Sequence, residues 1–235
     1  MSDMVAKSLA EVLGRVAAAS SRAGRPAPRL VAVSKTKPVE AVRAAFDAGQ
    51  RDFGENYVQE LLEKAPALPS DIRWRFIGHL QSNKAKALCA GVPNLAAVET
   101  VDSAKLATLL DAAWAPLCAA QGGRRLDVYV QVNTSGEETK HGVEPGEAVP
   151  LARHVAATCR HLRLAGLMTI GQPDYSSRPE NFTALAACRA AVAADLGVPP
   201  ADLELSMGMS GDFEQAVEMG SSNVRVGSAL FGARA

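Results

Sequence analysis

The sequence predicts an α/β fold, a single (β/α)8 TIM barrel with an extra N-terminal helix. Short apolar runs rich in β-branched residues alternate with segments whose apolar residues recur at helical spacing. Eight such alternations, with strands that read as buried, are typical of a parallel sheet that closes on itself. An open doubly wound sheet is disfavoured because no G-x-G-x-x-G turn follows the first strand. We therefore expect residues 1–235 to form one domain, a size that is ordinary for a barrel.

The elements follow one another in a regular order, beginning with a helix over 3–22. The expected strands are 30–35, 51–55, 73–78, 95–100, 126–133, 162–170, 203–208 and 223–230. The expected helices between them are 39–48, 57–65, 80–89, 103–120, 146–158, 179–196 and 212–219, and no clear helix follows the last strand. Pro38 opens a helix where its missing N–H costs nothing, and Gly49 stands where that helix should end. Asp102 and Ser103 supply a helix cap before the next run.

Composition and charge limit the classes of partner. The chain has 25 basic and 25 acidic residues, so it lacks the clustered positive charge that favours nucleic acid or an anionic membrane. No apolar run approaches the roughly 20 residues that a membrane span needs, and the N-terminus does not read as a signal peptide. We expect a cytoplasmic protein and, because no apolar outer stripe is evident, a monomer.

The cysteines carry no sign of a disulfide framework or a zinc site. They lie far apart, without a C-x-x-C pair and without histidines at metal-ligand spacing. Small buried thiols are the simplest interpretation, and we expect no metal site. The four positions are Cys89, Cys118, Cys159 and Cys188.

Polar side chains collect where the predicted strands end, which is the reactive face of a barrel. Lys35 is the most informative, because it ends the apolar run "LVAVS". Partial desolvation in the barrel mouth favours the neutral, nucleophilic amine that forms Schiff bases. The alternative is a lysine that reaches over the rim into solvent. Lys37, beside Pro38, is expected to face solvent or to contact an anion.

A second group of polar residues follows the last two strands. The segment "SMGMSGDFEQAV" places Ser206 and Ser210 just before a helix, where free backbone N–H groups bind anions, and Gly227 and Ser228 follow at the neighbouring strand end. Loops after strands seven and eight commonly hold phosphate in barrels. Ordinary loop and cap residues are the alternative. A lysine opposite a phosphate site predicts a cofactor that is both aldehyde and phosphate, pyridoxal 5′-phosphate.

Three further residues are candidates for contact with the ring of such a cofactor. Arg225 lies within an apolar strand and is costly to bury unless it meets a ligand or an acid such as Glu55 or Glu99. Near the pyridine nitrogen it would weaken the cofactor as an electron sink. Asn56 can bond the phenolic oxygen or cap the next helix. His79 can contact the ring or be purely structural.

Two other positions near the mouth are interpreted as structural. Met168, close to the end of the sixth strand, is expected to form part of the barrel wall. Lys140 lies in the long polar loop 133–147, which we interpret as solvated although it can reach over the mouth.

Together these residues fall in segments that resemble the pyridoxal phosphate homeostasis protein family, whose fold is similar to the barrel domain of bacterial alanine racemase. The similarity runs in order from about residue 28 to the C-terminus. The matching segments are "AVSKTKP", "DFGENYVQE", "FIGHLQSNKAK", "GLMTIG", "LSMGMSGDFEQAVEMGS" and "VRVGSALFGAR".

The resemblance implies a role for each candidate residue. Lys35 would be the Schiff-base lysine. The phosphate would be held by Ser210, Gly227 and Ser228, with Ser206 close by. By the same resemblance Asn56, His79 and Arg225 would line the ring. Ser228 stands where many relatives have threonine, which keeps the hydroxyl.

What the family implies about activity is mostly negative. Alanine racemase has a second, β-rich domain that brings a catalytic tyrosine from a partner subunit, and we expect no counterpart of it here because the barrel units extend to the end of residues 1–235. We therefore expect a protein that stores, buffers or delivers pyridoxal phosphate, with no efficient catalysis and no catalytic residue. Apo forms of pyridoxal enzymes are the expected recipients. The alternatives are a racemase or lyase of narrow specificity, with Lys37, Lys140 or Tyr57 as a second base, and a phosphate-binding barrel without pyridoxal.

Overall fold

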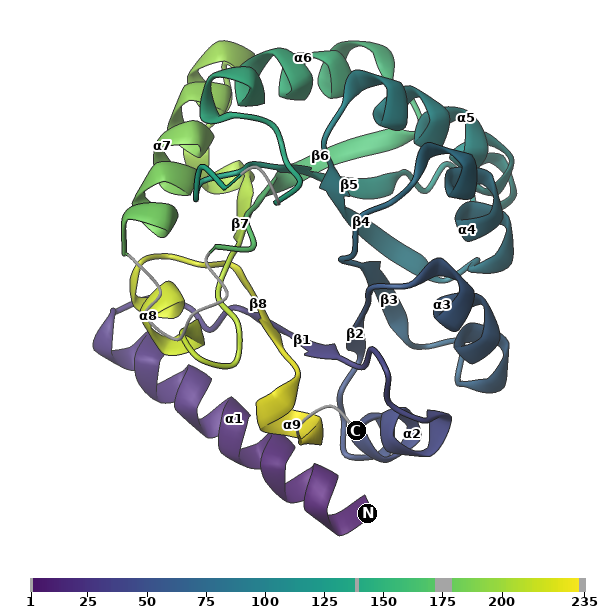
Figure 1. Ribbon diagram of the computed structural model, residues 1–235, viewed down its shortest axis with the longest axis vertical. Helices are drawn as coiled ribbons and strands as arrows, with labels where there is room; N and C mark the ends of the chain where they lie inside the picture. Colours follow the sequence, from purple (N-terminus) through teal and green to yellow (C-terminus); the bar gives the residue numbers. More distant parts are fainter. Residues whose placement is uncertain (1, 138–139, 172–178, 233–235) are drawn as a thin grey trace.

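The strands close into a complete ring. The computed structural model describes residues 2–137, 140–171 and 179–232. Within those ranges, eight parallel strands form a barrel in the order β1-β2-β3-β4-β5-β6-β7-β8, and β8 pairs with β1 to close it. Figure 1 shows the helices arranged around the outside of this ring. The predicted (β/α)8 barrel is confirmed.

The observed elements follow the predicted order, with most strands shorter than predicted. The strands are β1 (Arg29–Val33), β2 (Asp52–Glu55), β3 (Arg73–Phe76), β4 (Leu95–Val101), β5 (Leu126–Gln131), β6 (Leu162–Met168), β7 (Glu204–Ser206) and β8 (Asn223–Val226). The longer helices are α1 (Ser2–Arg22), α2 (Val39–Asp47), α3 (Val58–Lys64), α4 (Ala85–Gly91), α5 (Ala104–Ala120), α6 (Ala148–Thr158), α7 (Pro179–Leu196) and α8 (Phe213–Glu218). Short helices complete the described chain: η1 (Ala65–Ala67), η2 (Ser82–Lys84), η3 (Pro145–Glu147), η4 (Pro200–Asp202) and α9 (Ser228–Phe231).

Two predicted boundaries differ from the structure by four residues or more. The last strand ends at Val226 rather than at residue 230, because the chain turns at Gly227, whose carbonyl accepts the N–H groups of Leu230 and Phe231 to begin α9. The helix predicted over 80–89 starts only at Ala85, after the 3-10 turn η2. At Gly227 the apolar pattern of the strand continues into the helix, so the pattern alone does not locate that boundary.

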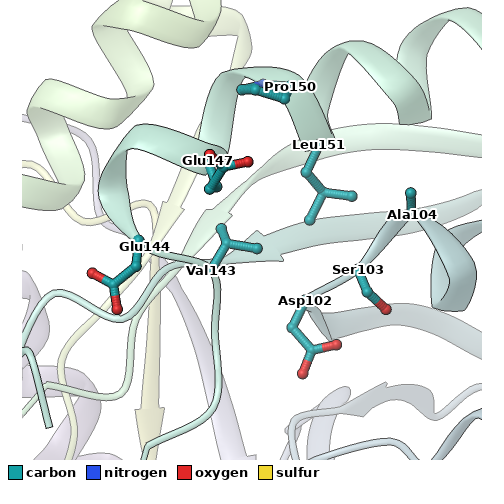
Figure 2. Close-up of a pocket in the computed structure, with 8 residues that line it drawn as sticks. All are labelled: Asp102, Ser103, Ala104, Val143, Glu144, Glu147, Pro150 and Leu151. Carbon is teal, nitrogen blue, oxygen red and sulfur yellow. The ribbon is translucent and has the colours of Figure 1, made fainter. Parts of the chain in front are cut away.

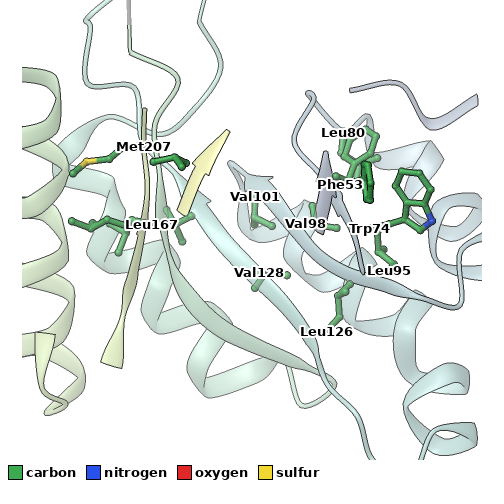
Figure 3. Packing of buried hydrophobic residues seen from close by; sticks show 14 of the residues in the cluster. Phe53, Trp74, Leu80, Leu95, Val98, Val101, Leu126, Val128, Leu167 and Met207 are labelled. Carbon is green, nitrogen blue, oxygen red and sulfur yellow. The ribbon is translucent and has the colours of Figure 1, made fainter. Parts of the chain in front are cut away.

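The apolar core lies between the outward face of the strands and the surrounding helices. Phe53 and Trp74 on neighbouring strands have ring centroids 5.9 Å apart, and both are fully buried. Figure 3 shows them with Val98, Val128 and Leu167, whose strands contribute to the same cluster. Alternate residues along each strand point to opposite faces, so the intervening positions face the inside of the barrel.

The N-terminal helix extends the same core. Helix α1 buries Val5, Leu9, Val12 and Val16, a spacing that places them on one helix face. That face packs against α2, α8 and α9, which flank the closure between β8 and β1. Across the described residues, no helix combines the length and apolar character needed to cross a membrane.

Candidate functional site

Lys35 lies two residues beyond β1, in a tight turn at the carboxyl end of the barrel. The turn is closed by the Lys37 N–H, which donates to the Ser34 carbonyl over 3.0 Å. Thr36 adopts a φ of +62°, a left-handed conformation that costs a β-branched residue energy and is held by its N–H donating to Glu60 over 2.7 Å. Lys35 itself is half-buried. The fold therefore holds the backbone on both sides of Lys35 in a single conformation.

A second lysine, not among the candidates predicted from the sequence, hydrogen-bonds to this turn. Lys64, at the end of α3, is only 5% exposed and donates to the Ser34 carbonyl and to Glu55, each over 2.8 Å. It also pairs with Glu60 at 2.5 Å. Burial raises the pKa of Glu55, and the positive charge of Lys64 opposes that shift. The Glu60–Lys64 spacing of four on a helix was the one signal in the sequence.

The residues predicted to hold phosphate come together at the ends of β7 and β8. The Ser210 hydroxyl accepts the N–H of Gly227 over 3.1 Å and that of Ala229 over 3.5 Å. Ser228, between them, is exposed at the start of α9. A Cβ on Gly227 would lie 3.3 Å from both the Cβ and the carbonyl oxygen of Val33, so glycine lets β8 approach β1 just before Lys35. The predicted phosphate residues thus adjoin the lysine turn.

Arg225 and Ser206 face the inside of the barrel and bond to each other. The Arg225 NH1 group donates to the Ser206 hydroxyl over 2.6 Å, and its NH2 group donates to the Thr169 carbonyl over 2.7 Å. Ser206 donates in turn to Glu99 over 2.5 Å, and Asn223 donates to the same carboxylate. Of the two acids suggested by the sequence, Glu99 is therefore the partner of this cluster.

The hydrogen bonds of Glu99 continue down the inside of the barrel. Arg75 donates to Glu99 over 2.5 Å and to the Tyr129 hydroxyl over 2.8 Å. That hydroxyl donates to Glu204 over 2.6 Å, and Glu204 pairs with Arg29 at 2.6 Å. We call the inward-facing residues Arg29, Arg75, Glu99, Tyr129, Glu204, Ser206, Asn223 and Arg225 the bore network. It links strands from both ends of the chain.

Opposite charges within the bore network stabilise one another. Burial by itself disfavours a charged Glu99, but the positive charges of Arg75 and Arg225 outweigh it and hold the pKa of Glu99 below its ordinary value. Burial lowers the pKa of Arg225, and the negative charge of Glu99 opposes that shift. A guanidinium remains protonated at neutral pH. The barrel interior therefore holds a positively charged Arg225 in a fixed position.

Asn56 follows β2 and carries a polar atom without a protein partner. Its side-chain oxygen is buried, and none of the described residues donates to it. The alternative role of Asn56 as a helix cap is wrong, since α3 begins after Tyr57 without a side-chain cap. The Gln131 side-chain oxygen on β5 is likewise buried and unpartnered among the described residues. Unsatisfied amides at this end of the barrel fit a polar ligand that completes their hydrogen bonds.

His79 lies on the rim and contacts residues from two other loops. Its Nδ1 atom is 3.5 Å from Asp102 Oδ2, and its ring stacks on His141 with centroids 3.6 Å apart. The ring is 39% exposed. The interpretation of Lys140 as solvated is wrong: its side chain is mostly buried, donates to the Gly171 carbonyl and pairs with Glu137. Met168 is fully buried in the barrel wall, as predicted.

A cavity of about 330 Å³ lies beside the mouth. Figure 2 shows its lining, with Asp102, Ser103 and Ala104 at the start of α5 and the other residues on the segment before α6 and in the first turn of that helix. The Ser103 hydroxyl caps α5 by accepting the Leu106 N–H, as predicted. The eight lining residues include none of the predicted cofactor residues. The two sites meet at Asp102, which contacts His79.

Comparison with known proteins places this barrel in a defined class. The family model for the N-terminal domain of alanine racemase matches residues 8–235. This match identifies the barrel as one of the alanine racemase type. The barrel has a lysine after its first strand and serine- and glycine-rich segments after its last two strands. The four cysteines are buried free thiols, as predicted.

Closer relatives narrow the class to one family. The pyridoxal phosphate homeostasis protein of Bos taurus is 52% identical over 215 residues, which cover 88% of this chain and 77% of the relative. The chain belongs to the pyridoxal phosphate homeostasis protein family. A solved structure from Bifidobacterium adolescentis is 37% identical with a TM-score of 0.84, covering 98% of this chain and 95% of that one. PipY of Synechococcus elongatus, solved with pyridoxal phosphate bound, is 33% identical with a TM-score of 0.75, covering 97% and 100%.

Proposed function

We propose that this protein binds pyridoxal 5′-phosphate through a Schiff base on Lys35 and stores, buffers or delivers it within the cell, without efficient catalysis. The observation that carries the proposal is the meeting of a fixed lysine turn with the Ser210–Gly227 edge. The name of its relatives and the cofactor bound to PipY support it. The pairing of β8 with β1 supports a single binding unit over residues 1–235.

The position of each predicted cofactor-binding residue supports a specific role. Lys35 supplies the amine that condenses with the cofactor aldehyde, releasing water. Ser210, Gly227 and Ser228 bind the phosphate through hydroxyl and backbone N–H groups. Arg225, held by Ser206, keeps a positive charge beside the ring nitrogen and so disfavours its protonation. Bound pyridoxal phosphate supplies an electron sink for amino-acid chemistry, which Arg225 in this position weakens.

Asn56 and His79 complete the proposed site from the opposite side of the mouth. The Asn56 amide can present either its oxygen or its NH2 group, and so it can bond the phenolic oxygen of the ring. His79 lies at the rim, where it limits how the ring enters. These assignments fit the unpartnered amide oxygen of Asn56 and the exposed edge of His79.

An amino-acid racemase or lyase of the same fold is the competing function, and it requires a second acid or base at the cofactor. Of the residues nominated from the sequence, Lys140 is engaged with the Gly171 carbonyl and Glu137, and Tyr57 is 55% exposed. These positions favour a carrier. Delivery to apo forms of pyridoxal enzymes is the corresponding partner hypothesis.

The first experiment locates the covalent attachment. The purified protein is loaded with pyridoxal phosphate, reduced with borohydride and digested, and the modified peptide is found by mass spectrometry. We expect the adduct on Lys35 and its loss in Lys35→Ala. Lys37→Ala, two residues away in the same turn, is the matched control and should retain the adduct. An adduct that persists in Lys35→Ala would contradict the proposed attachment.

The second experiment separates a carrier from an enzyme. The loaded protein is mixed with D- and L-amino acids and, separately, with an apo pyridoxal enzyme. We expect recovery of the apo enzyme's activity and no amino-acid turnover. Turnover on the order of 1 per second or more would instead establish an enzyme.

A further inference from the structure

Three potential metal ligands meet on the rim, each from a different loop. His79 follows β3, Asp102 follows β4, and His141 lies in the segment after β5. Their ligand atoms all lie within 4.8 Å of one another. The residues are separated by 23 and 39 positions in the sequence, so no ligand spacing is visible there. This explains why the sequence indicated no metal site.

The backbone after β5 is built to bring His141 back to the strands. Val143 donates to the Gln131 carbonyl over 2.9 Å and accepts from the Asn133 N–H over 2.8 Å, so the segment folds onto the end of its own strand. The Gln131 side chain also donates to the His141 carbonyl over 2.9 Å. Gly142, with a φ of +122°, permits the approach, since a Cβ there would lie 2.8 Å from the Asn133 nitrogen. The position of His141 is therefore fixed by hydrogen bonds independent of its ring.

The spacing of the first two ligands suits a metal better than a hydrogen bond. His79 Nδ1 and Asp102 Oδ2 are 3.5 Å apart. Two ligands at 2.0–2.2 Å from one tetrahedral ion are separated by about 3.4 Å. His141 stacks on His79 with an interplanar angle of 10°. Because a metal lies in the plane of each imidazole that binds it, the His141 ring must turn out of the stack to complete the set.

The surroundings favour a cation with an open coordination position. Asp102 also lines the cavity beside the mouth, and Glu144 and Glu147 are two further acids on its border (Figure 2). His79 is partly exposed, which provides an entry path. Two histidines and one carboxylate with a free fourth position form a common donor set for zinc and related divalent metals.

We propose that His79, Asp102 and His141 bind one divalent transition-metal ion of the zinc class at the rim of the barrel mouth. The ion would join the ends of β3 and β4 to the segment after β5, and its fourth coordination position would be open to solvent, because both histidines are exposed. The proposed metal site shares His79 with the proposed cofactor site but does not include Lys35, and it does not rest on the binding of pyridoxal phosphate.

The direct test is titration of the full-length, chelator-treated protein with zinc chloride in a calorimeter. We expect one zinc per chain. In Asp102→Asn and in His141→Ala the dissociation constant should rise at least about 100-fold, since loss of even an outer-shell partner lowers metal affinity 10- to 100-fold. His161→Gln is the matched control, because His161 also lies beside an aspartate, with Nδ1 3.1 Å from Asp111 Oδ2. It should bind zinc as the unmodified protein does.

A spectroscopic measurement keeps the test independent of the variants' folding. In the unmodified protein, zinc should shift the imidazole NMR signals of His79 and His141 and leave those of His154 and His161 in place. Saturable binding with that pattern supports the site. Failure to bind zinc, binding that survives both Asp102→Asn and His141→Ala, or equal loss in His161→Gln would overturn it.

Discussion

The two faces of the barrel strands differ sharply in chemistry. Outward-facing Phe53, Val98 and Leu205 join one apolar cluster with the helices. Inward-facing Arg75 and Glu99, on the same strands or their neighbours, are equally buried but charged. Burial of apolar surface contributes about 25 cal/mol per Å², whereas a buried ion pair can cost as much in desolvation as it gains. We infer that the outward face stabilises the fold and that the bore network positions Arg225 at the mouth.

The largest expected effect comes from breaking the outward face. Phe53→Ala removes a fully buried ring that packs against Trp74. We expect unfolding free energy to fall by about 4 kcal/mol, the usual cost of such a cavity. Denaturant titration measures this loss. At a temperature where the variant is folded, its affinity for pyridoxal phosphate should stay within about twofold of the unmodified protein, and a large affinity loss would contradict the division between the faces.

A somewhat smaller effect is expected in the bore network. Glu99→Gln leaves the positive charges of Arg75 and Arg225 without their buried counter-charge. We expect a loss of about 3 kcal/mol in unfolding free energy, and weaker cofactor binding because Arg225 is no longer held. Denaturation and spectroscopic titration test the two effects together. Unchanged binding would show that Arg225 is positioned without Glu99.

The pH dependence of the same variant has a definite sign. Because the pKa of Glu99 is lowered in the folded state, its stabilising contribution is complete above the unfolded value near 4.5 and is lost as the pH falls through the folded value. The stability difference between the unmodified protein and Glu99→Gln should therefore be constant above about pH 5 and shrink below pH 4.5. A difference that grows in acid would contradict this assignment.

The smallest expected effect on stability comes from a neutral residue of the bore network. Ser206→Ala removes the hydroxyl that joins Arg225 to Glu99. We expect a loss of about 1 kcal/mol in unfolding free energy. Cofactor affinity should fall about tenfold, because Arg225 loses one of its two described hydrogen bonds. Isothermal titration and denaturation measure both, and a stability loss without an affinity loss would assign Ser206 a purely structural role.

Some parts of the site were predictable and others were not. Lys35 and Gly227 end strands of a recognisable barrel, so their shared edge follows from the topology. Lys64 was missed because a lysine at a helix end is ordinarily exposed, and only the packed structure places it beneath the Lys35 turn. Asn56 was correctly placed at the mouth, but its capping alternative was decided by the backbone at Tyr57.

The sequence by itself determined the order of the barrel elements, the polar ends of its strands and the family to which those segments belong, because periodicity and short motifs are local properties of the chain. The tertiary structure decided which side chains pair. Glu99 rather than Glu55 joins the cluster of Arg225, and His79 meets Asp102 and His141, because closing the ring sets the register between distant strands. Such contacts depend on the position of whole elements in space, which local sequence does not encode.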